Sequence, residues 1–197
     1  MRQLLVATNN AGKLQEFERL LADLPAEVVS PQQIGLRLDV PEPYPTYAEN
    51  AAAKAEAFCR ASGLLVLADD SGIEAVALDG GPGVRTARFG GPQVVDRVAA
   101  LLERLDGATD RRARMVCWLA IGVPADAGPR VEIFSGVMEG SVTRAPRGSG
   151  GFGYDPVFEL PSGLTNAELP EGEKDRISHR GRAVAAAAPR LRELLTA

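Results

Sequence analysis

The chain has 197 residues, of which 45% are hydrophobic and 24% are charged, and its formal net charge at pH 7 is -4. This balance is typical of a globular protein and excludes a disordered or fibrous chain. The length allows a full hydrophobic core, and we predict one domain over residues 1–197. A general nucleic-acid binder would carry a basic surface, so we expect no nucleic-acid partner.

The N-terminal sequence and the cysteines indicate where the protein resides. The opening MRQLLVATNN lacks the apolar core of a signal peptide, and no window approaches the roughly 18 apolar residues of a membrane span. Cys59 and Cys117 lie far apart and match no metal-ligand spacing, so we expect both to be reduced and buried. We therefore predict a cytoplasmic protein without a membrane partner.

The basic residues are unevenly divided between two types. Of the 22 basic residues, 19 are arginine, and the three lysines are Lys13, Lys54 and Lys174. Where arginine is so strongly preferred, each lysine is a candidate for a position that needs a compact charge on a flexible stem. Biased codon usage would give the same counts.

The first 30 residues predict a strand, a polar turn, a helix and a second strand. Residues 2–7 are an apolar run, and residues 27–30 form the second strand. Apolar residues recur at helical spacing between them and stop at Pro25; they are Leu14, Phe17, Leu20, Leu21 and Leu24. This order is the opening of an α/β domain.

Further helices and strands follow an irregular, proline-rich segment over residues 31–45. A helix that Thr46 and Glu49 cap should extend to Ser62, and Gly63 should end it. The later predicted elements are a buried strand at 64–68, a glycine-rich loop at 79–92, a helix at 94–105, strands at 114–123 and 130–139, a glycine-rich turn at 147–155, a strand at 156–160, and a helix from Ser178 that Pro189 kinks or divides.

The polar turn after the first strand is a candidate anion site. Thr8, Asn9 and Asn10 precede a helix whose first N–H groups and positive dipole end favour an anion. Lys13, in the first helical turn, adds a full positive charge. Alternatively, Thr8 or Asn10 only caps the helix.

Two adjacent carboxylates, Asp69 and Asp70, follow the predicted strand 64–68. Ligands of open α/β sheets bind at the carboxyl ends of strands, and buried carboxylates need a metal, a cation or water. Adjacent side chains of a strand point in opposite directions, so we expect only one to face the site. Oxygen ligands without a Cys or His cluster suit Mg²⁺. A turn without a ligand could use the same residues.

Polar residues on two further segments form candidate sites. Asn50 and Lys54 lie four apart on a small-residue helix face, which suits an element beside a ligand, although a solvated lysine gives the same pattern. The second group gathers the single histidine with basic neighbours: Lys174, Ser178, His179 and Arg180. An exposed basic patch is the alternative.

The glycine-rich segment 148–155 has aromatic residues and a carboxylate at its end. Phe152 or Tyr154 could stack on a nucleobase, and Asp155 could accept hydrogen bonds from ring N–H groups. Alternatively, the glycines form a hairpin and the aromatic side chains belong to the core.

Taken together, five motifs in this order resemble the inosine triphosphate pyrophosphatases, also called XTP/dITP diphosphatases. The motifs are VATNNAGKLQEF, YAENAAAKA, LADDSGIEAVALDGGPGVRTARFGG, GSGGFGYDPVF and EKDRISHRGRA. The resemblance implies an α/β fold with an elongated central mixed sheet flanked by helices, and two lobes around a nucleotide-binding cleft. It also implies a homodimer.

The resemblance assigns roles to individual residues. Asp70 would be the catalytic carboxylate and, with Glu42, a ligand of Mg²⁺; Asp39 and Glu49 are nearby carboxylates. Ser71 would contact the nucleotide. The residues that would bind the triphosphate are Thr8, Asn9, Asn10, Ala11, Gly12, Lys13 and Lys54. The residues that would form a pocket for a 6-oxo purine are Phe152, Gly153, Tyr154, Asp155, Lys174, His179 and Arg180.

The implied activity is the Mg²⁺-dependent hydrolysis of ITP, dITP and XTP to the monophosphate and pyrophosphate, which clears these nucleotides from the cellular pool. The partner would be a small-molecule nucleotide. Two alternatives remain open at this point. One is a pyrophosphatase of the Maf type, acting on pyrimidine or modified nucleotides, and the other is a nucleotide sensor without turnover.

Overall fold

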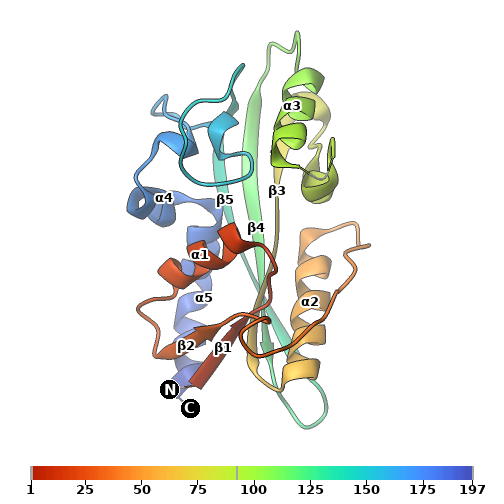
Figure 1. Ribbon diagram of the computed structural model, residues 1–197, viewed down its shortest axis with the longest axis vertical. Coiled ribbons are helices and arrows are strands. Elements are labelled where there is room, and N and C mark those ends of the chain that lie inside the picture. The colour runs from red at the N-terminus through yellow and green to blue at the C-terminus, as the bar shows by residue number, and fades with distance from the viewer. Residues whose placement is uncertain (1, 92, 197) are drawn as a thin grey trace. The chain divides into compact units, whose positions relative to one another are not determined.

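The protein, seen in a computed structural model, is described over residues 2–91 and 93–196 (Figure 1). Its strands in these ranges form one mixed sheet with the spatial order β2-β1-β3-β4-β5-β6. The strands are β1 (Arg2–Val6), β2 (Ala26–Val29), β3 (Leu65–Ala75), β4 (Arg112–Val123), β5 (Arg130–Val142) and β6 (Phe158–Glu159). Strand β1 pairs in parallel with β2 and β3, whereas β5 and β6 are antiparallel. The predicted α/β class with a mixed sheet is confirmed.

Internal contacts divide the chain into two compact units. Unit 1 consists of Met1–Asp70, Cys117–Gly136 and Arg180–Ala197, and unit 2 of Ser71–Val116 and Val137–His179. Strands β3, β4 and β5 each contribute residues to both units. The single domain and the cleft between lobes stay predictions. The described residues do not include Met1, Pro92 and Ala197. Pro92 is the last residue of the predicted glycine-rich loop.

Helices cover both faces of the strands within unit 1 (Figure 1). Helices α1 (Ala11–Leu20) and α5 (His179–Thr196) pack on one face with Leu4 and Leu67. Helix α2 (Tyr47–Ser62) packs on the other face with Leu5 and Ala68. Because successive strand residues point to opposite faces, the continuous apolar runs of β1 and β3 supply two cores at once.

The helices of unit 1 begin at the polar residues that the sequence indicates. Asn10 caps α1 by accepting a hydrogen bond of 3.1 Å from the N–H of Lys13. Thr46 caps α2 by accepting from the N–H of Glu49 at 3.3 Å, and Gly63 ends the helix in the left-handed conformation with φ 69°. The predicted helix from Thr46 to Gly63 is confirmed.

Unit 2 has its own hydrophobic core, which includes Leu101, Met138 and Phe158. In its described residues, the helices are α3 (Val94–Arg104) and α4 (Glu171–Ile177). The 3₁₀ turns there are η1 (Val76–Leu78), η2 (Gly83–Arg88), η3 (Asp155–Val157) and η4 (Asn166–Glu168). No helix in the described part of either unit is long and apolar enough to span a membrane.

The prediction that a strand ends before Asp69 is wrong. Strand β3 continues to Ala75, so both aspartates lie inside it. The apolar run stops at Ala68, but buried apolar residues return at Ile73 and Ala75, each 1% exposed. The polar residues interrupt the hydrophobic pattern without interrupting the strand.

The C-terminal third differs from prediction in its short elements. Of the predicted strand 156–160, only Phe158–Glu159 is a strand, because η3 occupies residues 155–157. Helix α4 was not predicted, since its sequence is polar and lacks an apolar stripe. Helix α5 begins at His179, one residue after the predicted start, and continues through Pro189.

The close approach of α2 to the sheet gives a prediction about stability. A Cβ atom at Gly122 in β4 would lie 2.8 Å from the carbonyl oxygen of Ala55 and 3.1 Å from Cβ of Cys59. Gly122→Ala should therefore push α2 away and lower the free energy of unfolding by about 1–3 kcal/mol, as measured by urea denaturation.

Gly172→Ala is the matched control, because a Cβ atom there meets nothing within 4 Å. It should leave the stability unchanged or raise it by up to about 1 kcal/mol. Equal stability of the Gly122 variant and the wild type would contradict the tight packing of α2.

Candidate functional site

Strand β3 directs Asp69 and Asp70 to opposite faces of unit 1. Oδ2 of Asp69 lies 2.8 Å from Nζ of Lys13 in α1. Oδ2 of Asp70 accepts a hydrogen bond of 3.1 Å from Nδ2 of Asn50 in α2. The predicted opposite orientation of the two side chains is confirmed, and it gives them different surroundings.

Asp69 is an ionised, buried carboxylate with cationic partners. It is 2% exposed, and Nη2 of Arg180 in α5 lies 3.5 Å from the same Oδ2 atom. Burial alone would raise the pKa of Asp69, but the charges of Lys13, Arg180 and Lys54 outweigh it and hold the pKa below its usual range.

Asp70 has the opposite electrostatic balance. It is 7% exposed, and burial raises its pKa above the ordinary value. The positive charge of Lys54 opposes this rise, whereas the negative charge of Glu42 adds to it. Ionised Asp70 is therefore under-compensated by the protein, which favours a bound proton or a bound cation at this carboxylate.

Asn50 connects Asp70 to the proline-rich segment that carries Glu42. Besides bonding Asp70, its side chain accepts from the N–H of Tyr44 at 3.0 Å and donates to the carbonyl of Tyr44 at 3.3 Å. The amide group thereby fixes residues 42–44 beside strand β3. The sequence predicts that Asn50 lies beside a ligand. In the structure, Asn50 links Asp70 to Tyr44 through hydrogen bonds.

Lys54 brings the backbone of β3 and the carboxylate of Glu42 together. Its ammonium group contacts Glu42 directly and donates to the carbonyl oxygen of Asp69 at 2.6 Å. Burial would lower the pKa of Lys54, but the charges of Asp69, Glu42 and Asp70 raise it. Lys54 therefore remains charged.

The donor set of Glu42 and Asp70 fits Mg²⁺. Two carboxylates beside a surface-accessible segment are what this ion uses when phosphates and water complete its coordination. Across residues 2–91 and 93–196, no group of three His, Cys, Asp or Glu side chains is placed to hold a metal by itself. Of the nearby carboxylates, Glu49 accepts a hydrogen bond from the Thr46 hydroxyl at 2.6 Å and Asp39 is exposed.

The turn before α1 both caps the helix and leaves donors for an anion. The N–H of Asn10 donates to Oγ1 of Thr8 at 3.2 Å, and Asn10 in turn caps Lys13. The N–H groups of Ala11 and Gly12 belong to the first turn of α1, and N–H groups at this position find no acceptor within the helix. The exposed residues of the turn are Asn9, Asn10 and Ala11.

In unit 2, a second group of predicted residues meets around Asp155. Its Oδ2 accepts hydrogen bonds from Nζ of Lys174 and from the N–H of Phe152, both at 2.7 Å. The Lys174 ammonium lies 5.1 Å from the centroid of the Phe152 ring. Nδ2 of Asn166 donates to the other carboxylate oxygen at 3.2 Å. The structure thus assembles an aromatic ring, a cation and a buried carboxylate.

Asn166 was not predicted, although the sequence carries an indication of it. Thr165 and Glu168 form a capping box around η4, and this spacing of Thr and Glu marks a local turn. The turn places Asn166 against Asp155.

The other residues predicted around the base lie in several environments. Tyr154 belongs to the core of unit 2, its hydroxyl donates to the carbonyl of Thr86 at 3.2 Å, and burial raises its pKa to about 12. Gly153 has φ 64° and Ser71 is half-buried in β3.

The alternative of an exposed basic patch near the C-terminus is wrong. All four residues of that group are buried, namely Lys174, Ser178, His179 and Arg180.

Glu16 is a charged residue of unit 1 that the sequence interpretation missed. It is 0% exposed, and its carboxylate contacts the guanidinium group of Arg180. Lys13, Glu16, Phe17 and Leu20 follow the i, i+3, i+4, i+7 spacing of a buried helix face, so the glutamate stands on an apolar stripe. That position, rather than the residue type, was the available indication.

Both cysteines are free and buried, as predicted. Burial raises the pKa of Cys117 to about 12. At neutral pH its thiol is therefore protonated and does not act as a nucleophile or a metal ligand.

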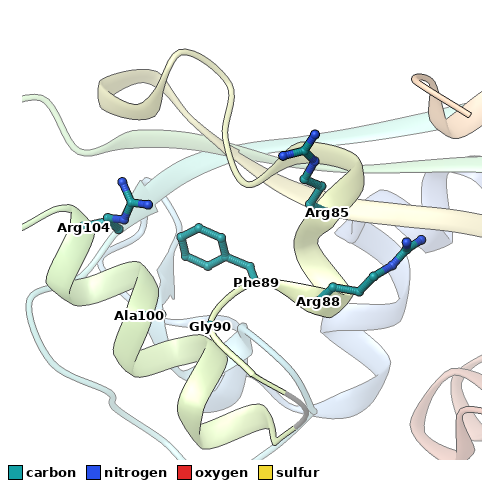
Figure 2. A pocket seen from close by; sticks show the side chains of 6 residues that line it. All are labelled: Arg85, Arg88, Phe89, Gly90, Ala100 and Arg104. Atoms are coloured by element: carbon teal, nitrogen blue, oxygen red, sulfur yellow. The ribbon is translucent and has the colours of Figure 1, made fainter. Parts of the chain in front are cut away.

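A separate hollow of about 360 Å³ lies within unit 2. Figure 2 shows Arg85 and Arg88 of η2 and Arg104 of α3 around the ring of Phe89. None of the predicted site residues lines this hollow.

Known proteins similar to the chain share one description. The profile of the Ham1 family matches residues 4–190. The chain is 47% identical over 198 residues to the dITP/XTP pyrophosphatase of Ralstonia nicotianae and 46% identical over 195 residues to that of Chromobacterium violaceum, each with 98% of both chains covered.

Solved structures agree with this description. A HAM1 protein from Coxiella burnetii superposes with a TM-score of 0.86 at 38% identity, covering 98% of this chain and 100% of the other. A nucleoside-triphosphatase / dITP/XTP pyrophosphatase from Mycobacterium abscessus gives a TM-score of 0.72 at 38% identity, covering 96% and 100%.

The two aspartates should affect stability in opposite directions. Folding raises the pKa of Asp70, so its ionisation weakens the fold, and Asp70→Asn should be more stable than the wild type at pH 7–8 without metal. This difference should shrink as the pH falls through the raised pKa and vanish below the ordinary pKa of about 3.9. Folding lowers the pKa of Asp69, which therefore stabilises the fold above the ordinary pKa of about 3.9.

Asp69→Asn should accordingly lower the free energy of unfolding by about 3–5 kcal/mol at pH 7, because it breaks a buried ion pair. Urea denaturation in EDTA between about pH 3.5 and pH 8, a range that includes the ordinary aspartate pKa, measures both variants. Shifts of the same sign at pH 7 would contradict the separate environments of the two carboxylates.

Proposed function

The chain belongs to the Ham1 family, and we propose that it hydrolyses ITP, dITP and XTP to the monophosphate and pyrophosphate with the help of Mg²⁺. The enzyme class, a nucleoside-triphosphate pyrophosphatase, is that of its relatives. The observation that carries the proposal is Asp70, a buried carboxylate of raised pKa that lies beside Asn50, near Glu42 and Lys54. In the cell, this reaction would remove abnormal purine nucleotides from the pool.

Unit 1 has the groups that a triphosphate and Mg²⁺ require. Glu42 and Asp70 would hold the ion, which neutralises phosphate charge and lowers the pKa of a water molecule when bound. The N–H groups of Ala11 and Gly12 and the ammonium groups of Lys13 and Lys54 supply donors for the phosphates. The contacts of Thr8, Asn9 and Asn10 position this turn.

The chemical step breaks the α–β phosphoanhydride bond of the nucleotide. The oxygen of a water molecule bonds to the α-phosphorus and becomes part of the nucleoside monophosphate. The Asp70 carboxylate accepts the proton that the water loses. The bridging oxygen leaves with pyrophosphate, whose developing negative charge the lysines stabilise. Asn50 keeps Asp70 oriented through its hydrogen bond.

The residues around Asp155 suit recognition of the base. Phe152 offers an aromatic face, and the buried ammonium of Lys174 is a donor for the 6-oxo group of hypoxanthine or xanthine. Adenine has a 6-amino group there, so its binding would leave a buried donor unpaired. We assign Gly153, Tyr154 and His179 to the support of this pocket and Ser71 to nucleotide contact, whereas Arg180 pairs with Glu16 and Asp69 in unit 1. The protein would act in the cytoplasm as a homodimer. A measurement of its molecular mass in solution tests the homodimer.

Asp70→Asn should abolish hydrolysis while the protein stays folded. We expect kcat for ITP to fall on the order of a thousandfold, which corresponds to about 4 kcal/mol, because the variant loses both a metal ligand and the proton acceptor. Release of pyrophosphate from ITP with Mg²⁺ measures the effect, and EDTA should abolish the wild-type reaction.

Wild-type release of pyrophosphate would itself exclude a sensor without turnover. Retention of activity in the Asp70 variant would refute the role given to this carboxylate. Circular dichroism confirms that the variant is folded.

Variants in unit 2 should alter the choice of base rather than the treatment of the triphosphate. Lys174→Met should lower kcat/KM for ITP and XTP by about a hundredfold, with little change for ATP, since only the 6-oxo group loses its donor. Arg176→Met, an exposed cation of the same helix, is the control. Steady-state rates with ITP, XTP, ATP, dUTP and modified UTP provide the measurement.

A wild-type preference for pyrimidine nucleotides in this panel would favour an enzyme of the Maf type. An equal loss for ITP and ATP in the Lys174 variant would contradict the purine pocket.

A further inference from the structure

We infer that Glu16, acting through Arg180 and Asp69, is a positioning residue for the phosphate-binding group of Lys13. This inference deepens the proposed function, because it rests on Lys13 binding the triphosphate. Neither Glu16 nor Asp69 would touch the substrate. Their role would be to hold one ammonium group where the phosphates bind.

The four charged groups form an alternating row in unit 1. Lys13 lies 2.8 Å from Oδ2 of Asp69, and Nη2 of Arg180 lies 3.5 Å from the same oxygen atom. Glu16 contacts the other terminal nitrogen atom of Arg180, Nη1. Two positive and two negative charges thus follow one another from α1 through β3 and α5 back to α1. The row has no net charge.

The row of charges extends from the interior of unit 1 to its surface. The side chains of Glu16, Asp69 and Arg180 are at most 3% exposed, whereas that of Lys13 is 19% exposed. Three members therefore lie in the interior, where an unpaired charge is costly. Only the ammonium of Lys13 reaches the surface, next to the exposed turn over residues 9–11.

Arg180 depends on carboxylates for its placement. It lies in the first turn of α5, where the positive end of the helix dipole disfavours a cation. Helix α1 holds it from two sides, since Glu16 pairs with one nitrogen atom and the Phe17 ring centroid lies 5.6 Å from the guanidinium carbon. Burial would lower the pKa of Arg180, but Asp69 and Glu16 raise it.

Glu16 thereby determines how Asp69 divides its charge between two cations. With Glu16 in place, Arg180 has a carboxylate partner of its own, and Asp69 makes its shorter contact with Lys13. Without that negative charge, the buried guanidinium would draw the Asp69 carboxylate toward itself. Lys13 would then lose its fixed partner and regain the rotamer freedom of a long side chain, at a cost to phosphate binding.

A double-mutant cycle separates positioning from general support of the fold. Glu16→Gln keeps the size of the side chain and removes its charge. We expect it to raise KM for ITP about tenfold with kcat nearly unchanged, and to have no further effect in a Lys13→Met background. Glu18→Gln, an exposed glutamate of the same helix, is the matched control and should change neither constant.

Equal losses from Glu16→Gln in the two backgrounds would overturn the inference, because they would show an effect that bypasses Lys13. If Glu16→Gln does not fold, the double variant Glu16→Leu/Arg180→Met removes the buried pair without leaving an unpaired charge, a change that proteins often tolerate. It also removes the guanidinium that would draw Asp69 away, so Lys13 keeps its partner and Lys13→Met should raise KM as much in this background as in the wild type. A smaller effect of Lys13→Met in the double variant would overturn the inference.

A second readout does not require enzymatic activity. The chain has only three lysines, so acylation by an amine-reactive ester can be followed at each one by mass spectrometry. Glu16→Gln should accelerate acylation of Lys13 several-fold and leave Lys174, which pairs with Asp155 in unit 2, as an unchanged internal standard. Unchanged Lys13 reactivity would overturn the inference, whereas absence of ITP hydrolysis with increased reactivity would contradict only the proposed function.

Discussion

The ion pair between Lys13 and Asp69 joins helix α1 to strand β3, and the arrangement of unit 1 depends on it. Asp69 is buried beside a second buried carboxylate, and the geometry of a strand sends the two side chains to opposite faces. The charges of Lys13 and Lys54 act on both carboxylates, but the direct contacts of the two side chains differ. Helices α1 and α5 therefore supply the cations for Asp69, while α2 brings Asn50 and Lys54 toward Asp70.

The two faces use their charges for different purposes. On the α1 face, positive and negative groups balance, and the carboxylate stabilises the folded state in its ionised form. On the α2 face, Glu42 and Asp70 leave the negative charge under-compensated, which weakens the fold and suits the binding of a cation. Active sites commonly break the local rules that the rest of a protein obeys. In the active site that we propose, the break is confined to Asp70, one of two neighbouring residues.

Most elements of unit 1 follow from local sequence, because Asn10 and Thr46 are capping residues and the apolar runs match their strands. The choice of the three lysines as candidate site residues also follows from the sequence, because arginine is so strongly preferred among its basic residues. The length of β3 does not, since strand residues 69–72 are polar and their strand conformation depends on neighbouring strands. The role of Glu16 was hidden for a related reason: its partner Arg180 lies 164 positions away, and nothing in α1 indicates it.

That separation also governs the order in which the molecule can be completed. Synthesis proceeds at about 5–20 residues per second, so roughly 8–30 s pass between the emergence of Glu16 and that of Arg180. During this interval the nascent chain has its polar turn and both aspartates, but it lacks the cation that balances Glu16. Helices α1 and α5 contribute to the same hydrophobic core, so this core is complete only when α5 is present. A ribosome-bound intermediate would thus contain every proposed metal ligand before Lys13, the proposed phosphate-binding lysine, acquires its final support.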